Sequence, residues 1–403
     1  MASVQRSERE RGQVVAIIAI AMVALLAMTA LIVDGGTAFA QQRVTQNGAD
    51  AASEAGAVVL MQRLAGVVPA KTGDDVDVAV QANAATNGLT TPVQACYTGI
   101  NGIPLNADGT SNTDCLAAAQ VGPGLPIPPC SDCPGGFASG VRVSGSRPFS
   151  TFFAGIVGLT GFTASATATA IAGYVNGLAG PVLPVTYPVF ATACDGTNHA
   201  MTGSTTPWPV GPNNTLTIPL CQDSAGNVGW LDWTPTAGGQ PELAGAILGS
   251  PSNPTITTPR WYYITATGNV SNVQVQTAME HWIGTDVILP IFSETCDDTP
   301  NNLADPVGQI TDCPAGHLGG HGSNNWYFLV GFAAFHLEEV HIQGTNTTEC
   351  NVYPVFLSGG NGGTSCLVGY FVGPEHAVSL GASVGAGGGS DASTSLVGVQ
   401  LIR

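Results

Sequence analysis

Hydrophobic residues form one uninterrupted run near the N-terminus and are interspersed with polar ones elsewhere. Residues 14–33 read VVAIIAIAMVALLAMTALIV, without charge or proline. A run of about 20 residues, rising 1.5 Å each, crosses the hydrocarbon core of a bilayer, whereas the apolar region of a signal peptide is typically about 7–15 residues. The pattern therefore predicts a transmembrane helix over residues 12–34, after a cytoplasmic segment at residues 1–11.

Charges next to the run predict its orientation. Positively charged residues stay on the cytoplasmic side, and three arginines precede the run, at Arg6, Arg9 and Arg11. We expect a single-pass protein of the cell membrane, with the N-terminus cytoplasmic and the bulk of the chain extracytoplasmic. One alternative stays open. Residues 38–40 (AFA) have the small-x-small pattern of a signal-peptidase site, and cleavage there would give a secreted protein beginning at Gln41.

A helical pattern continues beyond the apolar run. Residues 41–66 are rich in alanine, and their apolar positions recur at helical spacing. We expect one helix over residues 12–66, which Gly35-Gly36 could bend. Asp34 could pair with a neighbouring chain, although an acid in the headgroup region needs no partner. A row of small residues four apart would allow close helix packing, at Gly48, Ala52 and Gly56.

The remaining pattern predicts an α+β fold. A short helix, or a mixture of strand and helix, is expected at residues 74–85. A boundary near residues 177–181 would separate an α+β region, residues 35–177, from a β-rich extracytoplasmic domain, residues 178–403.

Short strands separated by turn residues predict the β-rich domain. Its last strand is expected to return into its own sheet, and Pro290 and Pro354 are expected to mark edge strands. A helix is expected at residues 271–282, capped by Ser271 and closed by Gly284. The expected strands are residues 182–193, 215–221, 261–267, 286–292, 326–338, 352–357, 366–372 and 394–402.

Composition and charge favour a β-rich fold and argue against a nucleic-acid partner. The chain has 403 residues, of which 53 are glycine and only 9% are charged, which suits strands and turns better than a helical bundle. Residues 72–403 hold 4 basic and 22 acidic side chains, a net charge of about −18. Such a surface repels phosphate backbones, so we expect no nucleic-acid partner.

The chain has 10 cysteines, with none before Cys96. This pattern indicates disulfides in an oxidising compartment. Pairing of chain neighbours would join Cys194 to Cys221, Cys296 to Cys313 and Cys350 to Cys366. Four others have three possible pairings, among which the sequence does not choose: Cys96, Cys115, Cys130 and Cys133. The last two form a CxxC, but no βαβ context or second CxxC supports a redox or zinc site.

No arrangement of residues predicts catalysis or a cofactor. The GxSxG pattern at residues 381–385 lies in a segment biased to Gly, Ala and Ser, and no histidine follows it to complete a triad. The only lysine, Lys71, is not part of a phosphate-binding GxxxxGK motif. We therefore expect a protein that is not an enzyme.

Metal ligands are only weakly indicated. His336 and Glu338 would share one face of a strand, but nothing in the sequence brings them to His317 and His321. Acidic and amide side chains crowd the loop between Cys296 and Cys313, and such oxygen ligands suit Ca²⁺. The weak calcium candidates are Asp297, Asp298 and Asp305.

The N-terminal part resembles a known family. Its matching features are Arg11-Gly12 before the apolar run, VDGG at residues 33–36 and NGADAA at residues 47–52. A second stretch, RPFSTFFAGIVG at residues 147–158 followed by TASATATA at residues 163–170, matches as well. Over residues 1–175 the chain resembles TadG-like proteins of the tight-adherence (Tad/Flp) pilus assembly system. The resemblance implies a strand–short helix–strand unit at about residues 139–172.

The resemblance implies a function and partners. It implies a membrane-anchored, pseudopilin-like accessory protein of a Tad/Flp-type pilus assembly or secretion system. The membrane and other pilin-like or pilus-assembly subunits would be its partners, with the Gly48, Ala52 and Gly56 row packing against such subunits. Flp-type prepilins are cut after a glycine and carry Glu five residues on; after Gly12 that position is Ile17, so we expect a permanent anchor. The alternative is an anchored adhesin-like or calcium-stabilised binding module.

Overall fold

The structure is a computed structural model of the chain. It describes residues 3–178, 182–185, 187–188, 210–219, 231, 240–249, 255–264, 273–297, 310, 312–318, 325–342, 366–372, 383–385 and 396–402. A long apolar helix and two largely antiparallel sheets give the α+β class that the sequence predicts, and disulfides are present as expected.

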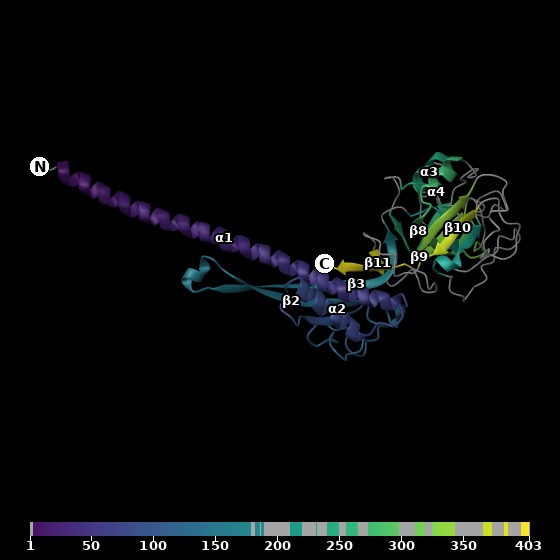
Figure 1. The fold of residues 1–403 in the computed structure, drawn as a ribbon, viewed down its shortest axis with the longest axis horizontal. Coiled ribbons are helices and arrows are strands. Elements are labelled where there is room, and N and C mark those ends of the chain that lie inside the picture. The colour runs from purple at the N-terminus through teal and green to yellow at the C-terminus, as the bar shows by residue number, and fades with distance from the viewer. Residues whose placement is uncertain are drawn as a thin grey trace.

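A single helix, α1 (Ser3–Leu64), dominates the N-terminal part (Figure 1). It contains no proline and runs through Gly35-Gly36 without a break. Its apolar first half projects away from the rest of the chain, and the most apolar window is entirely exposed. Among the described residues, α1 is the one helix long and apolar enough to cross a membrane. It therefore has the length and composition of a membrane anchor.

The second half of α1 is a core helix of an α+β region. It packs against α2 (Gly73–Thr86) and against the first sheet, which contains β1 (Gln94–Thr98), β2 (Gly140–Ser150) and β3 (Gly161–Leu178). The ambiguous pattern at residues 74–85 thus forms a helix, started by a capping box between Thr72 and Asp75.

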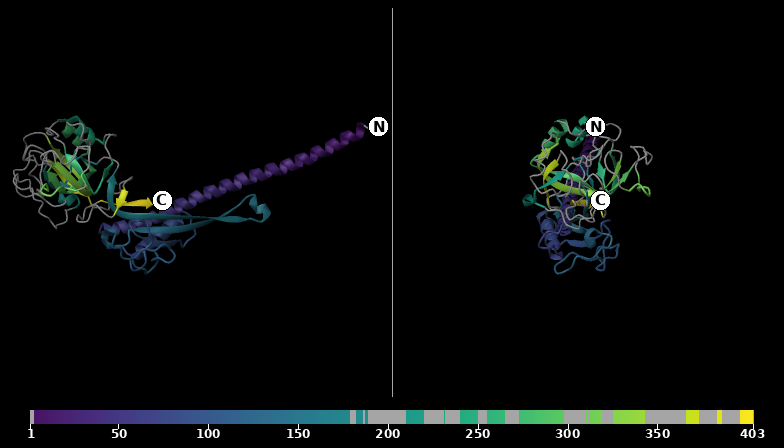
Figure 2. Two further views of the ribbon diagram at one scale, coloured as in Figure 1. Left: turned by 180° about the vertical axis from the view of Figure 1, so that it is seen from behind. Right: turned by 90° about the vertical axis from the view of Figure 1, so that its right-hand side faces the viewer.

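Strands β2 and β3 form a long antiparallel hairpin. Their pairing is continuous from Gly140–Ile171 to Ser150–Gly161, and the short helix between them is the 3₁₀ turn η2 (Ala154–Val157). The predicted strand–helix–strand unit is therefore confirmed. Figures 1 and 2 show that the hairpin extends beside α1 towards its apolar half. Alanines alternate with exposed Ser and Thr along β3, and the alanines pack on α1 through Ala49.

A second sheet, with the order β4-β8-β9-β10-β5 and β7 beside β9, lies beyond the end of β3. Two short helices, α3 (Gln240–Ile247) and α4 (Val273–Glu280), pack on its core. Of these, α4 lies within the helix expected at residues 271–282, whose expected cap Ser271 is outside the described residues, whereas α3 is not predicted. The strands are β4 (Tyr187–Pro188), β5 (Leu216–Pro219), β7 (Arg260–Ile264), β8 (Thr285–Asp297), β9 (Asn325–His341) and β10 (Cys366–Phe371).

The expected place of the last strand is wrong. Instead of joining the second sheet, β12 (Val397–Ile402) pairs with β3 in the first. The strands β6 (Ile256–Thr257) and β11 (Ser383–Gly385) also pair with β3. The physical reason is the length of β3, which continues past its pairing with β2 and has a second edge free for other strands.

The edge-strand expectation for Pro290 is also wrong. Its strand, β8, pairs with β9 on one side and with the two residues of β4 on the other. The expected strand at residues 352–357, which includes Pro354, lies outside the described residues. So does half of the strand expected at residues 182–193. Two further 3₁₀ turns are η1 (Pro134–Gly136) and η3 (Pro212–Asn214).

Three disulfides lie within the described residues. Cys296 bonds to Cys313, which is the pairing of chain neighbours that the sequence suggests. The open question at the other four is settled by the bonds Cys96–Cys115 and Cys130–Cys133. Cys366 is also disulfide-bonded. Cys194, Cys221 and Cys350 lie outside the described residues, so the pairings expected for them are not tested.

Candidate functional site

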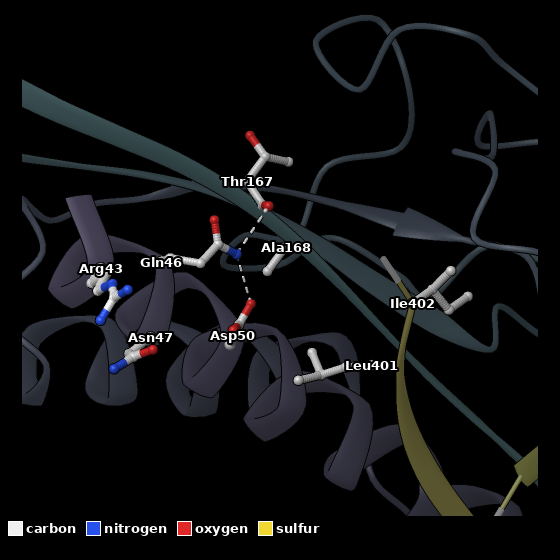
Figure 3. A pocket seen from close by; sticks show the side chains of 8 residues that line it. All are labelled: Arg43, Gln46, Asn47, Asp50, Thr167, Ala168, Leu401 and Ile402. Atoms are coloured by element: carbon white, nitrogen blue, oxygen red, sulfur yellow. Dashed lines mark hydrogen bonds between the residues drawn. The ribbon is translucent and has the colours of Figure 1, made fainter. Parts of the chain in front are cut away.

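A groove of about 760 Å³ lies where α1, β3 and β12 meet (Figure 3). It is open to solvent and combines charged, amide and apolar side chains from parts of the chain that are far apart in sequence. The lining residues are Arg43, Gln46, Asn47, Asp50, Thr167, Ala168, Leu401 and Ile402.

One side of the groove is a face of α1. Its four lining residues recur at spacings of three and four, which places them on one side of a helix. The Nε2 of Gln46 donates to Asp50 Oδ1 at 2.8 Å and to the backbone oxygen of Thr167 at 3.5 Å, as drawn in Figure 3. The amide of Gln46 thus links the helix to the strand and holds the Asp50 carboxylate at the groove.

The other side is an edge of β3. Strand β12 pairs with β3 only from Thr169 to Tyr174. Before Thr169, no described strand occupies this edge of β3; two glutamines of α1 reach it instead. Gln42 donates to the backbone oxygen of Ser165 at 2.8 Å, one helical turn from the contact of Gln46 with Thr167. Side-chain amides therefore satisfy strand groups that a neighbouring strand would otherwise satisfy.

The row of small residues on α1 (Gly48, Ala52 and Gly56) lies on the face opposite the groove and points into the core. This corrects the prediction that the row packs against other subunits. A Cβ added at Gly48 would lie 3.0 Å from Leu89, and one at Gly56 would lie 2.8 Å from Val80. Ala52 is completely buried in the same core. Gly48, Ala52 and Gly56 permit close packing, as expected, but the partner is the chain's own α2 and first sheet.

The groove combines charged and polar groups with apolar ones. Arg43 supplies a cation, Asp50 an anion, and Gln46 and Asn47 supply amides that both donate and accept hydrogen bonds. None of the described lining residues is a histidine, cysteine or serine. Next to the groove, partial burial and then the charge of Asp50 raise the pKa of Glu54 above its ordinary value. The arrangement suits a polar protein surface with an apolar component.

A second polar contact ties the hairpin tip to α1. The carboxylate of Asp34 accepts hydrogen bonds from three successive backbone N–H groups, those of Phe152 (2.8 Å), Phe153 (3.1 Å) and Ala154 (2.6 Å). Asp34 thus has a partner within its own chain, where the sequence suggests either a neighbouring chain or none.

The predicted metal ligands are not brought together in the part of the chain that is described. Asp297 ends β8, and its backbone N–H donates to the backbone oxygen of His317 at 2.8 Å. Asp298, Asp305 and His321 lie outside the described residues. His336 instead contacts Asp286 at 2.7 Å, and no group of three metal-binding side chains occurs among the described residues.

The GxSxG segment does not have the form of a nucleophile elbow. Ser383 begins β11, which pairs with β3 at Gly177, whereas an elbow requires a sharp turn between a strand and a helix. Of the six tryptophans, Trp261 and Trp326 are buried, and Trp282 donates to the backbone oxygen of Ile247 at 2.9 Å. Trp208, Trp230 and Trp233 lie outside the described residues.

The sequence alone does not predict the groove, although two of its lining residues lie in a stretch that the sequence analysis singles out. Asn47 and Asp50 belong to the NGADAA stretch, but their sequence pattern gives them no role. Thr167, Ala168, Leu401 and Ile402 are missed, because their place depends on the pairing of strands more than 200 residues apart in sequence. The available signal was the spacing of Gln42 and Gln46, four residues apart on α1.

These features define a protein with one long helix, exposed and apolar in its first half and built into an α+β region in its second. A family model, Flp pilus-assembly TadE/G-like (Tad), matches residues 12–59. The N-terminal segment of this chain is therefore similar to TadE/G-like proteins over residues 12–59, a stretch that includes both Asp34 and the α1 side of the groove. Searches among curated proteins and among solved structures found no match.

Proposed function

We propose that this protein is a non-enzymatic, pseudopilin-like accessory subunit of a Tad/Flp-type pilus assembly or secretion system. The single observation that carries the proposal is the TadE/G-like match over residues 12–59, which covers the exposed apolar half of α1 and the start of its packed half. In this role the first half of α1 holds the protein in the cell membrane, and the α+β region positions a binding surface next to it.

Orientation follows from the same helix. Arg6, Arg9 and Arg11 precede the apolar residues and hold the N-terminus in the cytoplasm. The disulfides then lie outside the cytoplasm, where oxidation maintains them. This agreement between charge and disulfides supports the proposed orientation.

The groove is the surface that we assign to a neighbouring pilin-like subunit. It presents a strand edge, the cation of Arg43, the anion of Asp50 and two amides at the level where α1 enters the α+β region. A subunit that presents a strand or a polar helix face would find donors and acceptors there without displacing the packed core. The buried small-residue row offers no such surface.

The test is co-purification from membranes of the native host. We expect the full chain to recover subunits that mass spectrometry identifies as carrying pilin-like or TadE/G-like segments. Joint replacement of the exposed Arg43→Ala and Asn47→Ala should lower the recovery severalfold, while Val78→Ala, exposed on α2 and outside the groove, should leave it unchanged.

The outcomes separate the two parts of the proposal. If the unaltered chain recovers no such subunit, a role in pilus assembly is contradicted. If it recovers them and the groove variant does so equally well, the assembly role stands and the groove is not the contact.

A further inference from the structure

We propose that the tip of the β2–β3 hairpin, residues 149–162, rests on the lipid surface beside α1 and forms a second membrane contact. The inference rests on the proposed membrane anchoring and extends it, since the family match ends at residue 59 and does not include the hairpin.

The tip has the composition of a membrane-contacting loop. Residues 148–163 read PFSTFFAGIVGLTGFT and contain no charged side chain, although the hairpin projects from the body of the protein. Large apolar side chains are solvent-exposed there: Phe152 by 73%, Leu159 by 53% and Phe162 by 47%. In segments that lie in the membrane interface, Phe and Leu side chains are buried at the boundary between headgroups and acyl chains.

The position of the tip is fixed by Asp34. This residue follows directly after the apolar run at residues 14–33, so it marks the level at which α1 leaves the hydrocarbon. Its carboxylate binds the backbone N–H groups of Phe152, Phe153 and Ala154. The exposed tip is therefore held at the membrane boundary by a contact between residues about 120 positions apart in sequence.

The helix carries an apolar side chain at the same level. Phe39 is 78% exposed, and at 1.5 Å per residue it lies only about 8 Å beyond Asp34 along α1. Phe39 and the tip continue the exposed apolar surface of the transmembrane part of α1 outwards. Phe149 and Phe162, whose ring centroids are 6.2 Å apart, pair across the hairpin where the tip begins.

These observations favour lipid over a protein partner. The apolar surface is continuous with a helix half that already requires lipid, and no charged group within residues 148–163 would set the specificity of a protein contact. Because the tip carries no charge, its entry into the headgroup region costs little desolvation free energy. Removing three large apolar side chains from water is favourable.

The experiment measures the surroundings of the tip in the full chain, reconstituted into nanodiscs of zwitterionic lipid. The variant Phe152→Cys carries an NBD fluorophore. Val78→Cys, which is 66% exposed on α2, is the matched control, and Ile20→Cys, 71% exposed within the apolar run, reports the anchor. Quenching is compared between spin-labelled lipid and aqueous iodide.

We expect lipid to quench the label at position 152 severalfold more than the label at position 78, with iodide showing the reverse order. Quenching by lipid at position 20 but not at position 152 would overturn the inference and leave the anchor intact. If neither position 20 nor position 152 is quenched by lipid, the anchor fails and the inference fails with it. A label at position 152 that is shielded from both quenchers would show a protein contact instead, and this too would overturn the inference.

Discussion

Individual glycines in α1 have opposite roles, although they occur in one continuous helix. At Gly35 and Gly36 an added Cβ would meet nothing within 4 Å, whereas at Gly56 it would lie 2.8 Å from Val80 and 3.0 Å from Val141. Both neighbours are β-branched and have little rotamer freedom to move away. Gly56 is therefore required for packing, and the Gly35-Gly36 pair is not.

We expect Gly56→Ala to lower the free energy of unfolding by about 1–3 kcal/mol, because the added methyl group overpacks the core. Gly35→Ala should not destabilise the chain, since alanine is the better helix former and has open space there. Urea unfolding of both variants in detergent micelles measures the difference. Equal stability of Gly56→Ala and the unaltered chain would show that α1 does not approach α2 and β2 as closely as the structure has it.

Among the elements, α2 owes its start to two side chains. The hydroxyl of Thr72 accepts from the backbone N–H of Asp75, and Asp75 in turn accepts from the backbone N–H and the hydroxyl of Thr72. These hydrogen bonds to the ionised carboxylate, the backbone one first, lower the pKa of Asp75 below its ordinary value.

Two substitutions test this capping box. Thr72→Ala should lower the free energy of unfolding by about 1 kcal/mol, as is typical of a lost N-cap.

Because the pKa of Asp75 is lower in the folded chain, the contribution of this carboxylate to stability is present above the unfolded pKa of about 3.9. That contribution is lost as the pH falls through the folded value. The stability difference between Asp75→Asn and the unaltered chain should therefore disappear at acidic pH. A difference that stays constant down to pH 2 would contradict this account.

Elements with a strong local pattern are the ones that the sequence predicts. The apolar run and the alanine-rich stretch after it specify α1, and the alternation of Ala with Ser and Thr specifies β3. By contrast, α3 has only eight residues and no capping signal, and the inward direction of Gly48 and Gly56 depends on Val80 and Leu89, which lie far along the chain. The β3 and β12 side of the groove is not predictable from the sequence for the same reason, because Leu401 comes to lie opposite Ala170 only through strand pairing.

At the scale of the whole molecule, the two sheets are joined through β3. Its last residues, Val175 and Leu178, pack in one cluster with Phe292, Tyr327 and Phe332 of the second sheet. Strand β12 then returns the chain to the first sheet beside β3. The part of the chain that forms the second sheet is therefore an insertion between two strands of the first.

This topology predicts which part of the molecule depends on the last strand. Deleting residues 396–402 should speed amide hydrogen exchange at residues 169–174 of β3, since these residues pair with β12. Exchange at residues 285–291 of β8, which pair with β9, should change much less. Mass spectrometry of peptides from both strands makes the comparison. Faster exchange in β8, with exchange in β3 unaffected, would show that the last strand belongs to the second sheet, and this would contradict the structure.

The return of β12 also has a mechanical consequence. Besides the pairing of β6 and β11 with β3, the inserted part is joined to the first sheet along the chain at the end of β3, Leu178, and at the start of β12, Val397. These two attachments lie on neighbouring antiparallel strands, Val397 being opposite Tyr174, so both leave the sheet at the same end. A force that pulls the inserted part away from the membrane is therefore divided between two strands and directed along both. Neither strand can be drawn out without shearing its hydrogen bonds to the other, so the outer part resists traction better than one attached by a single linker.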